Sequence, residues 1–377
     1  MLTRVTSAII LLIFFSFQSS SQNEILKEKP LRIAVVGLVH THVHWILGRE
    51  ARGDIELVGI AEPNHDLAER YSKQHGYPMD IVYNTMEEMI EKTKPEAVLA
   101  FNSIYDHLKV VEYCAPRGIH VMVEKPLAVS VEHSAKMIDL AKKYNIHLLT
   151  NYETTWYGTN EKAWHIIKEQ KAIGEIRKII FYTGHQGPVE IGCNKEFLDW
   201  LTDPVLNGGG SLTDFGCYGS NLATWLMNGK APNTVSAVTQ QIKPHLYPKV
   251  EDEATIVLTY DSAQVIIQAS WNWPYSRKEM EVYGKTGIVF CKNGKDMLVR
   301  ETDKKEAYPI EAGSLPIDRN DPFSYFANVI NGKINMDRYD LSSPGNNEIV
   351  MKILDAAKHA AKTGETVVWN KFFKTDK

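Results

Sequence analysis

Cysteine is scarce in this sequence of 377 residues. The only four are Cys114, Cys193, Cys217 and Cys291, which lie far apart and form no Cys-x-x-Cys pair. This spacing argues against a zinc knuckle and against a redox-active disulfide. A chain of this length can bury a core that does not need disulfides, so cystine bridges are left open but are not required.

Basic runs are also absent. The sequence has 42 basic and 46 acidic residues, a formal net charge of −4, which argues against a nucleic-acid-binding protein that neutralises phosphates. We therefore expect no nucleic-acid partner. The hydrophobic content of 44% and the charged content of 23% are those of a soluble globular protein, and the length suggests two domains.

An apolar run long enough to cross a bilayer is missing as well. Residues 8–17 are apolar apart from Ser16, but a run of roughly ten residues is too short for a stable membrane insertion. Arg4 precedes this run, and small polar residues follow it up to Gln22, which is typical of a cleaved secretory signal. We predict a signal peptide over residues 1–22 and an exported, periplasmic or extracellular protein. There is no twin arginine and no lipoprotein cysteine.

The segment Leu31–Trp45 combines an apolar strand, a tight turn and a helix start. Ile33 to Val36 is typical of a buried parallel strand, and Gly37 lets the chain turn sharply after it. The following helix would aim its free N–H groups and positive dipole end at an anion such as a pyrophosphate. We predict that a dinucleotide binds at this turn, which contributes Gly37, Val39, His40, Thr41 and His42.

A second apolar strand, residues 54–61, ends at Glu62, roughly 20 to 25 residues after the turn, where dinucleotide-binding folds hold a ribose diol. A carboxylate there accepts hydrogen bonds from ribose hydroxyls and repels a 2′-phosphate. Pro63 and Asn64 provide no arginine for such a phosphate. NAD is therefore favoured over NADP. A simple strand-end acid with no cofactor role remains an alternative reading of Glu62.

Strands and helices alternate up to about residue 150, which predicts an α/β fold with a doubly wound parallel Rossmann sheet over residues 30–150. From residue 151 to 377, long strands of alternating polarity predict an α+β domain with an open, largely antiparallel sheet. A last helix, Asn346–Lys362, could pack back on the first domain.

Two motifs can carry chemistry. Glu124-Lys125-Pro126 directly follows the strand His120–Val123 and so places a lysine at the carboxyl end of a central strand, where ligands of such sheets bind. A triple glycine, 208–210, precedes a helix that presents Asp214 and Tyr218 on one face at i and i+4. The glycines would allow a ligand to approach the backbone closely.

These residues occur in the same order in the Gfo/Idh/MocA oxidoreductases, the family of glucose-fructose oxidoreductase and inositol dehydrogenase, which the sequence resembles from residue 30 onward. The resemblance implies NAD(P)-dependent oxidation or reduction of sugars or cyclitols, and an open sheet that forms a homo-oligomer. It places Asn102, His107, Glu124 and Lys125 beside the cofactor. The catalytic lysine, aspartate and histidine of the family correspond to Lys125, Asp214 and the position of Tyr218, and some members resemble this chain in having tyrosine there.

Three departures from the family pattern affect the expected site. Val39 and His42 replace glycines of the G-x-G-x-x-G motif, which makes the pyrophosphate turn wider or bulkier. The arginine that many members have after the Rossmann domain is missing from residues 151–157, so an acidic substrate is disfavoured. Export without a twin-arginine signal would require the cofactor to be acquired outside the cytoplasm.

His40, His42 and His44 alternate in a way that invites a metal interpretation. In a helix only His40 and His44 would align, and no third ligand is identifiable, so we predict no metal and expect phosphate or ribose contacts instead. Among the aromatic residues, Tyr152 and Trp200 are predicted to contact the substrate.

The leading prediction is an NAD-dependent oxidoreductase for a sugar, polyol or cyclitol. Lys125 would polarise the reacting oxygen, Asp214 would orient the substrate, and Tyr218 would act as a phenolate-like base whose pKa the neighbouring ammonium lowers. One alternative is an enzyme that retains its NAD through a redox-neutral cycle, either between two sugars or as an elimination-type glycosidase. Another is an exported sugar-binding module without catalysis.

Overall fold

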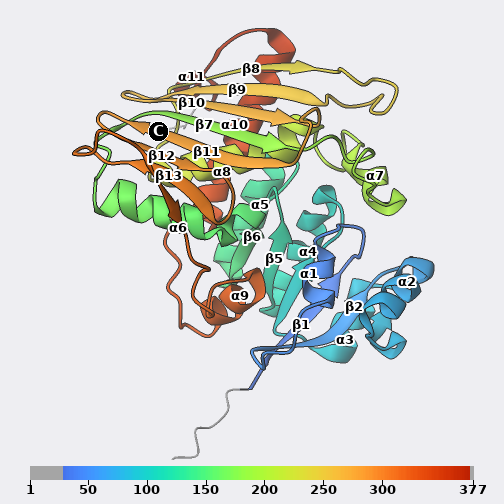
Figure 1. The fold of residues 1–377 in the computed structure, drawn as a ribbon. Coiled ribbons are helices and arrows are strands. Elements are labelled where there is room, and N and C mark those ends of the chain that lie inside the picture. The colour runs from blue at the N-terminus through green and yellow to red at the C-terminus, as the bar shows by residue number, and fades with distance from the viewer. Residues whose placement is uncertain (1–28, 374–377) are drawn as a thin grey trace, which may run out of the picture.

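The computed structural model describes residues 29–373, so the predicted signal segment 1–22 lies outside the described residues. Two sheets organise this part of the chain, and Figure 1 shows the larger one above the smaller one. The smaller sheet has six parallel strands in the order β3-β2-β1-β4-β5-β6. Its strands are β1 (Leu31–Val36), β2 (Ile55–Ala61), β3 (Val82–Tyr83), β4 (Ala97–Ala100), β5 (His120–Glu124) and β6 (Leu148–Asn151).

Helices cover both faces of this sheet. Residues that point to opposite sides of β1 belong to two different hydrophobic cores. Ala34 and Val36 pack with helices α3 (Met86–Thr93), α4 (His107–Cys114) and α5 (Val131–Tyr144). Ile33 and Val35 pack with α1 (Val43–Leu47) and α2 (His65–His75). The predicted doubly wound Rossmann sheet is confirmed.

Local sequence explains why several of these helices begin and end where they do. The side chains of Asn64, Thr85 and Ser130 each accept a hydrogen bond from a backbone N–H in the first turn of the helix that follows. Gly76 ends α2 and Asn145 ends α5, both in the left-handed conformation that closes a helix C-terminus.

The larger sheet has nine strands in the order β14-β13-β12-β11-β7-β10-β9-β8-β15. All of its strand pairs are antiparallel except β7 with β10, as predicted for a largely antiparallel sheet. Its strands are β7 (Ile176–Gly184), β8 (Thr234–Gln240), β9 (Glu253–Thr259), β10 (Gln264–Ser270), β11 (Arg277–Gly284), β12 (Ile288–Cys291), β13 (Asp296–Arg300), β14 (Tyr308–Glu311) and β15 (Val367–Val368).

Two long helices, α8 (Ser211–Leu226) and α10 (Pro344–Thr363), cover one face of this sheet, and α10 also contacts α5 and β6. The shorter helices of this half are α6 (Gly158–Trp164), which continues as a π-helix over His165–Glu169, α7 (Lys195–Leu201) and α11 (Trp369–Phe372). Within residues 29–373, no helix combines the length and apolar character that a membrane crossing requires.

Helix α9 (Pro322–Ile330) comes late in the sequence but packs on the Rossmann sheet. Phe323 and Phe326 join the core formed by β1, α1 and α2. Asp321, at the start of the helix, accepts hydrogen bonds from Arg49 at 3.2 Å and Arg52 at 2.7 Å. The predicted division at residue 151 therefore misses a segment that returns to cover the first sheet.

Candidate active site

The turn between β1 and α1 packs directly on the loop after β4. Gly37 has a φ of +81°, and its N–H donates to the carbonyl oxygen of Ala61 at 2.8 Å. A Cβ on Gly37 would lie 2.8 Å from the backbone of Asn102, so only glycine fits there. Helix α1 is short and begins after His42, its N-cap, so His40 precedes the helix instead of lying in it.

Glu62, at the end of β2, is buried, and the backbone holds its carboxylate. One oxygen accepts the N–H of Leu38 at 2.7 Å, and the other accepts the N–H of Asn64 at 2.8 Å. Burial raises the pKa of Glu62, and these hydrogen bonds only partly oppose that effect. Each oxygen keeps a further lone pair with which it could accept a hydroxyl group.

A cavity of about 570 Å³ lies against Glu62, and Gly37, Val39, Asn102 and Trp200 also line it. The buried Oδ1 atom of Asn102 has no hydrogen-bond partner among the described residues. A buried acceptor without a partner, next to a carboxylate with spare lone pairs, fits a ligand that donates hydroxyl and amide hydrogens. The residues present therefore fit the ribose and amide groups of a nicotinamide dinucleotide.

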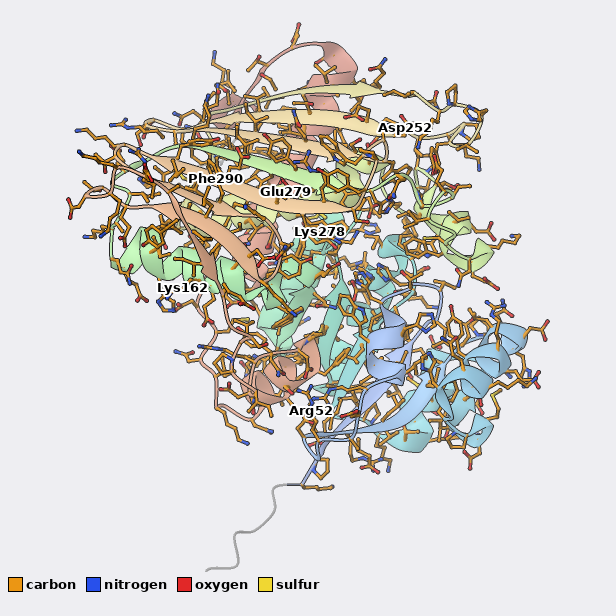
Figure 2. The ribbon with its side chains drawn as sticks, in the orientation of Figure 1. Arg52, Lys162, Asp252, Lys278, Glu279 and Phe290 are labelled. Atoms are coloured by element: carbon orange, nitrogen blue, oxygen red, sulfur yellow. The ribbon has the colours of Figure 1, made fainter. Side chains whose placement is uncertain are left out.

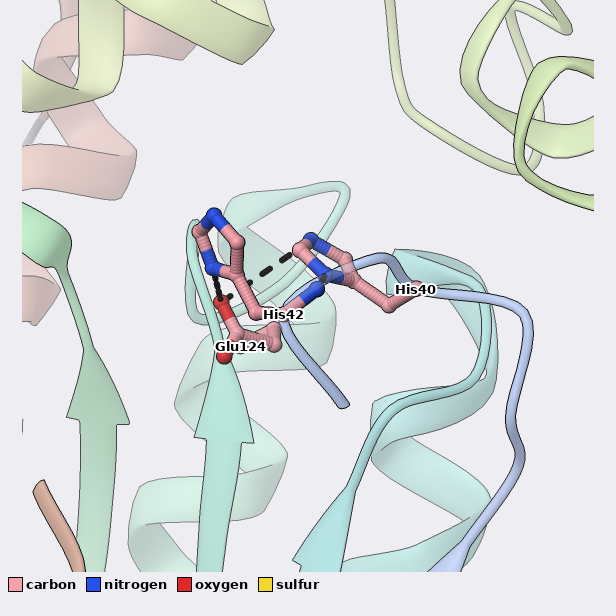
Figure 3. A group of neighbouring side chains, drawn as sticks. All are labelled: His40, His42 and Glu124. Carbon is pink, nitrogen blue, oxygen red and sulfur yellow. Dashed lines mark hydrogen bonds and ion pairs between the residues drawn. The ribbon is translucent and has the colours of Figure 1, made fainter. Parts of the chain in front are cut away.

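His40 and His42 both lie against Glu124, at the carboxyl end of β5 (Figure 3). The Nδ1 atom of His42 is 2.9 Å from Oε2 of Glu124, and the Nε2 atom of His40 is 3.8 Å from the same oxygen. The other carboxylate oxygen accepts the Nδ2–H of Asn151 at 2.7 Å. Burial acts to raise the pKa of Glu124, but both imidazoles and the hydrogen bonds outweigh it and hold the pKa at about 2.

These three side chains bring three possible metal-ligand atoms within 4.8 Å of one another. The expected alignment of His40 with His44 is wrong, because His44 instead pairs with His75 at 2.8 Å. The donor set still does not suit a metal. Nδ1 of His40 accepts the backbone N–H of His42 at 3.2 Å, and burial lowers the pKa of His40 well below its usual value. The neutral ring therefore carries its hydrogen on Nε2, the atom a metal would need.

His107 is fully buried, and its Nδ1 lies 3.1 Å from the carbonyl oxygen of Leu127. Burial lowers the pKa of His107 to about 4, so the ring is neutral and donates that hydrogen bond. In this position it supports the chain just after Lys125. The structure does not place His107 on the wall of the cavity beside Glu62.

Lys125 and Asp214 form a buried ion pair between the two sheets. The ammonium group also donates to the backbone carbonyl of Asp214 at 3.1 Å, and Nε1 of Trp271 donates to the second carboxylate oxygen at 2.9 Å. Burial opposes both charges, yet each partner outweighs it: the pKa of Lys125 is raised and that of Asp214 is lowered. Both groups are therefore charged at neutral pH.

The backbone of other segments of the chain, rather than a ligand, packs closely against the triple glycine before α8. A Cβ on Gly210 would lie 1.9 Å from the carbonyl oxygen of Glu251, and one on Gly208 would lie 2.9 Å from that of Val129. The backbone N–H groups of Gly210 and Leu212 donate to the carboxylate of Glu251 at 2.9 and 3.1 Å. The expected close approach of a ligand at these glycines is wrong.

Tyr218 faces two ammonium groups, with Nζ of Lys125 5.2 Å and Nζ of Lys278 5.6 Å from its ring centroid. Burial nevertheless raises the pKa of Tyr218 well above its usual value, and the carboxylate of Glu153 adds to the rise. The predicted lowering of this pKa is therefore wrong, because burial of the phenol outweighs the nearby cations. Tyr218 can donate a hydrogen bond, but it is a poor proton acceptor.

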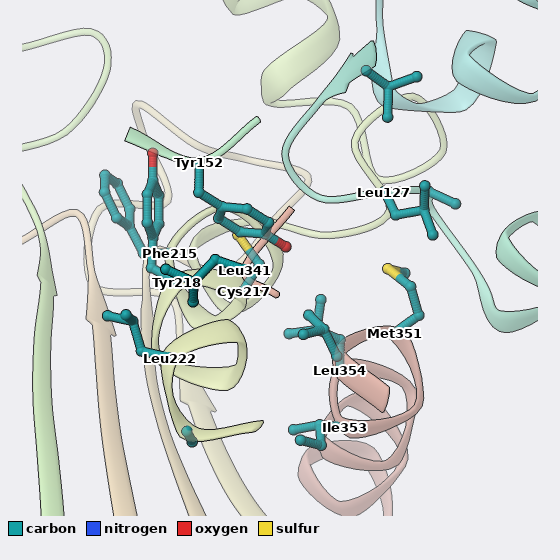
Figure 4. Packing of buried hydrophobic residues seen from close by; sticks show 14 of the residues in the cluster. Leu127, Tyr152, Phe215, Cys217, Tyr218, Leu222, Leu341, Met351, Ile353 and Leu354 are labelled. Atoms are coloured by element: carbon teal, nitrogen blue, oxygen red, sulfur yellow. The ribbon is translucent and has the colours of Figure 1, made fainter. Parts of the chain in front are cut away.

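The structure does not place the two predicted substrate aromatics where a substrate would meet them. Tyr152 is completely buried, and its hydroxyl donates to Oδ1 of Asn347 at 3.0 Å. In Figure 4 this hydroxyl points into the core formed by α8 and α10. Trp200 lines the cavity beside Glu62 and stacks on His40, with ring centroids 5.5 Å apart, so it lies on the cofactor side.

Several polar residues of this centre are not part of the motifs found in the sequence. Lys278, near the start of β11 on the side of the large sheet that faces the smaller domain (Figure 2), pairs with Glu153 at 2.7 Å. Glu153 also accepts the hydroxyl of Tyr157 at 2.5 Å. His185 follows β7, and burial, only partly opposed by Asp214, lowers its pKa to about 4. The position of Glu153 after a parallel strand is the one signal that could have identified any of them.

Comparison with known proteins agrees with this geometry. Residues 31–152 match the model of an oxidoreductase family with an NAD-binding Rossmann fold, and residues 162–290 match the GFO/IDH/MocA C-terminal domain. The chain is 25% identical over 237 residues to trans-1,2-dihydrobenzene-1,2-diol dehydrogenase of Xenopus tropicalis, covering 63% of this chain and 67% of that protein.

Two solved structures share the fold. Aldose-aldose oxidoreductase from Caulobacter crescentus, complexed with glycerol, superposes with a TM-score of 0.74 at 22% identity, covering 90% of this chain and 99% of that one. An inositol dehydrogenase homolog from Azotobacter vinelandii, complexed with NAD+, has a TM-score of 0.72 at 18% identity and covers 90% and 97%. The chain belongs to the Gfo/Idh/MocA family of NAD(P)-binding oxidoreductases.

Proposed function

We propose that this protein is an NAD-dependent dehydrogenase that interconverts a hydroxyl and a carbonyl group on a sugar, polyol or cyclitol. The observation that carries the proposal is the buried pair of Lys125, which directly follows β5, with Asp214 on α8; the pair lies between the two sheets. Ligands of open α/β sheets bind at the carboxyl ends of the strands, and both the pair and the cavity beside Glu62 lie there.

The chain's own groups suit this chemistry. The ammonium of Lys125 can donate to the reacting oxygen and stabilise negative charge that develops on it. Asp214 holds Lys125 and is itself held by Trp271, so the ammonium is fixed in position. Tyr218, which stays protonated, can donate a second hydrogen bond to the substrate. A bound nicotinamide would supply the hydride acceptor.

NAD is favoured over NADP because Glu62 is a carboxylate at the position expected for the ribose diol. The next two residues, Pro63 and Asn64, line the same cavity and carry no positive charge for a 2′-phosphate. We propose a polyhydroxylated substrate because of the similar proteins named above. They are a diol dehydrogenase, an aldose-aldose oxidoreductase and an inositol dehydrogenase homolog.

The test compares Lys125→Ala with Lys92→Ala, a control whose lysine pairs with Glu88 on the surface of α3. Turnover on a panel of aldoses, inositols and diols should fall by roughly 10² or more in Lys125→Ala and stay unchanged in the control. Thermal unfolding should shift upward with millimolar NAD and less with NADP. A wild-type protein that neither oxidises any substrate of the panel nor shifts with NAD would favour the non-catalytic sugar-binding module.

Export and cofactor retention are further parts of the proposal. Mass spectrometry of the protein from its native host should find the first 20 or so residues removed, as expected for a signal peptide. If the cofactor is retained, extensively dialysed protein should release nucleotide on denaturation and react with a sugar when no NAD is added. A nucleotide-free protein that is active only on added NAD would contradict retention.

A further inference from the structure

Oxidation of a hydroxyl requires a group that takes its proton, and the expected groups are unsuitable. The pKa of Tyr218 is raised, so its phenol stays protonated. Lys125 is a protonated ammonium held by Asp214. Each carboxylate oxygen of Asp214 already accepts a hydrogen bond, one from Lys125 and the other from Trp271. A proton acceptor is therefore missing from the cluster that the sequence motifs identify.

His42 has the geometry of such an acceptor. Because Glu124 is ionised, its Oε2 can only accept, so the Nδ1 atom of His42 at 2.9 Å must be the donor. In the neutral form of the ring, the lone pair is then on Nε2. This is the arrangement in which a buried carboxylate fixes the tautomer of a catalytic imidazole.

Both members of this pair are held in place by their surroundings. The ring of His42 stacks on Trp45, with centroids 4.0 Å apart and an interplanar angle of 13°. The carboxylate of Glu124 accepts a hydrogen bond from the side-chain amide of Asn151. The amide oxygen of Asn151 in turn accepts one from the indole N–H of Trp156 at 2.9 Å. The imidazole can therefore neither rotate freely nor lose its carboxylate partner without breaking further contacts.

The second ring nitrogen of His42 is not used by Glu124, and His42 lies close enough to the carboxylate of Glu153 for the two groups to interact. The side chain of His42 is 17% exposed, and Figure 3 shows the second ring nitrogen pointing away from Glu124 above the end of β5. The charged and titratable groups that interact with His42 are Glu124, His40 and Glu153. Glu153 belongs to the pair with Lys278 that lies beside Tyr218.

We propose that His42 is a catalytic proton acceptor and that Glu124 is its positioning residue. This inference rests on the proposed dehydrogenase function. The substrate O–H bond breaks and its proton forms a bond with Nε2 of His42, while the hydrogen on the same carbon leaves as hydride to a nicotinamide cofactor. The substrate is oxidised to a carbonyl compound and the cofactor is reduced. In the opposite direction, the imidazolium returns the proton.

The first test measures the tautomer directly in the protein without added substrate or cofactor. Nitrogen-15 NMR of labelled histidine should show the hydrogen of neutral His42 on Nδ1, with the signal assigned by its loss in His42→Gln. Glu124→Gln should reduce the preference for that tautomer. A hydrogen found on Nε2 in the wild-type protein would overturn the proposal whatever the enzyme's activity.

The second test uses chemical rescue. His42→Ala should lower the single-turnover rate of substrate oxidation by roughly 10² to 10⁴, and added imidazole should restore part of that rate. The affinity for NAD should change by only a few-fold. His44→Ala is the matched control: His44 lies two residues further along the chain, in α1, and its imidazole pairs with His75, so neither the substitution nor added imidazole should change the rate.

Each other outcome overturns the assignment in a recognisable way. Weaker NAD binding with an unchanged single-turnover rate would make His42 a cofactor contact only. Loss of wild-type activity with a chelator, restored by zinc, would make the cluster a metal site. If the wild type is active and His42→Ala is equally active, the role proposed for His42 is wrong but the proposed dehydrogenase function stands. If the wild type is inactive and does not bind NAD, the proposed function itself is contradicted.

Discussion

Two glutamates lie at the carboxyl ends of two strands of the same Rossmann sheet and have opposite electrostatic environments. Glu62 follows β2 and is held by backbone N–H groups alone, and burial raises its pKa. Glu124 ends β5 and has two imidazoles against it, so its pKa falls to about 2 although it is more deeply buried. The partners, rather than the depth of burial, decide whether each carboxylate is stabilised as an anion.

The comparison extends to the regions around the two residues. Around Glu62 the hydrogen-bond donors are uncharged backbone N–H groups, those of Leu38 and Asn64. Around Glu124 the partners are the imidazoles of His40 and His42 and the amide of Asn151, and Lys125 pairs with the ionised Asp214, 89 residues away. We therefore expect substitutions at the end of β5 to have larger effects than substitutions at the end of β2.

The largest effect is expected for Lys125→Met. It leaves Asp214 buried without its cation, which typically costs about 3–5 kcal/mol in the free energy of unfolding. Urea unfolding at pH 7 measures this loss. The double variant Lys125→Met/Asp214→Asn should recover part of it, because no uncompensated buried charge remains. Equal stability of the wild type and the single variant would show that the pair is not buried as described.

Glu124→Gln should have the next largest effect, and that effect should depend on pH. The folded pKa of about 2 lies below the ordinary value of 4.5, so the ionised carboxylate stabilises the fold above about pH 4.5 and loses that contribution as the pH falls toward 2. The variant should be less stable than the wild type by about 3 kcal/mol at pH 7. The difference should shrink in unfolding experiments below pH 4.5, and a difference independent of pH would contradict the ionised Glu124.

Glu62→Gln should have the smallest effect and the opposite pH dependence. Because the folded pKa of Glu62 is raised above 4.5, its contribution is fully present below that pH and is lost as the pH rises through the folded pKa. At pH 7 we expect the variant and the wild type to differ by only about 1 kcal/mol, the size of one altered hydrogen bond. The wild type should gain stability relative to the variant as the pH falls. If the stability differences of the Glu62 and Glu124 variants changed with pH in the same way, the contrast between the two glutamates would be contradicted.

Local sequence patterns were sufficient to predict the fold. The apolar run before Gly37, the acid that ends β2 and the alternation of strands and helices each depend on neighbouring residues, and each is present as expected. The i, i+4 placement of Asp214 and Tyr218 on α8 is likewise a property of a single helix. Such features follow from the spacing of residue types along a strand or a helix, and this spacing can be read directly from the sequence.

The chemistry of the site depended on tertiary structure. His42 and Glu124 are 82 residues apart, and Glu153 and Lys278 are 125 apart, so no local pattern brings either pair together. The sequence suggested that an ammonium would lower the pKa of Tyr218, but segments far along the chain bury the phenol and reverse that shift. Helix α9 covers the first sheet for the same reason, since an apolar face shows that a helix will be buried but does not say against which element. The sequence by itself determined the strands, the turns and the residue types at their ends; only the folded chain decided which of those residues meet and which of them stay charged, because desolvation and pairing depend on every neighbour in space.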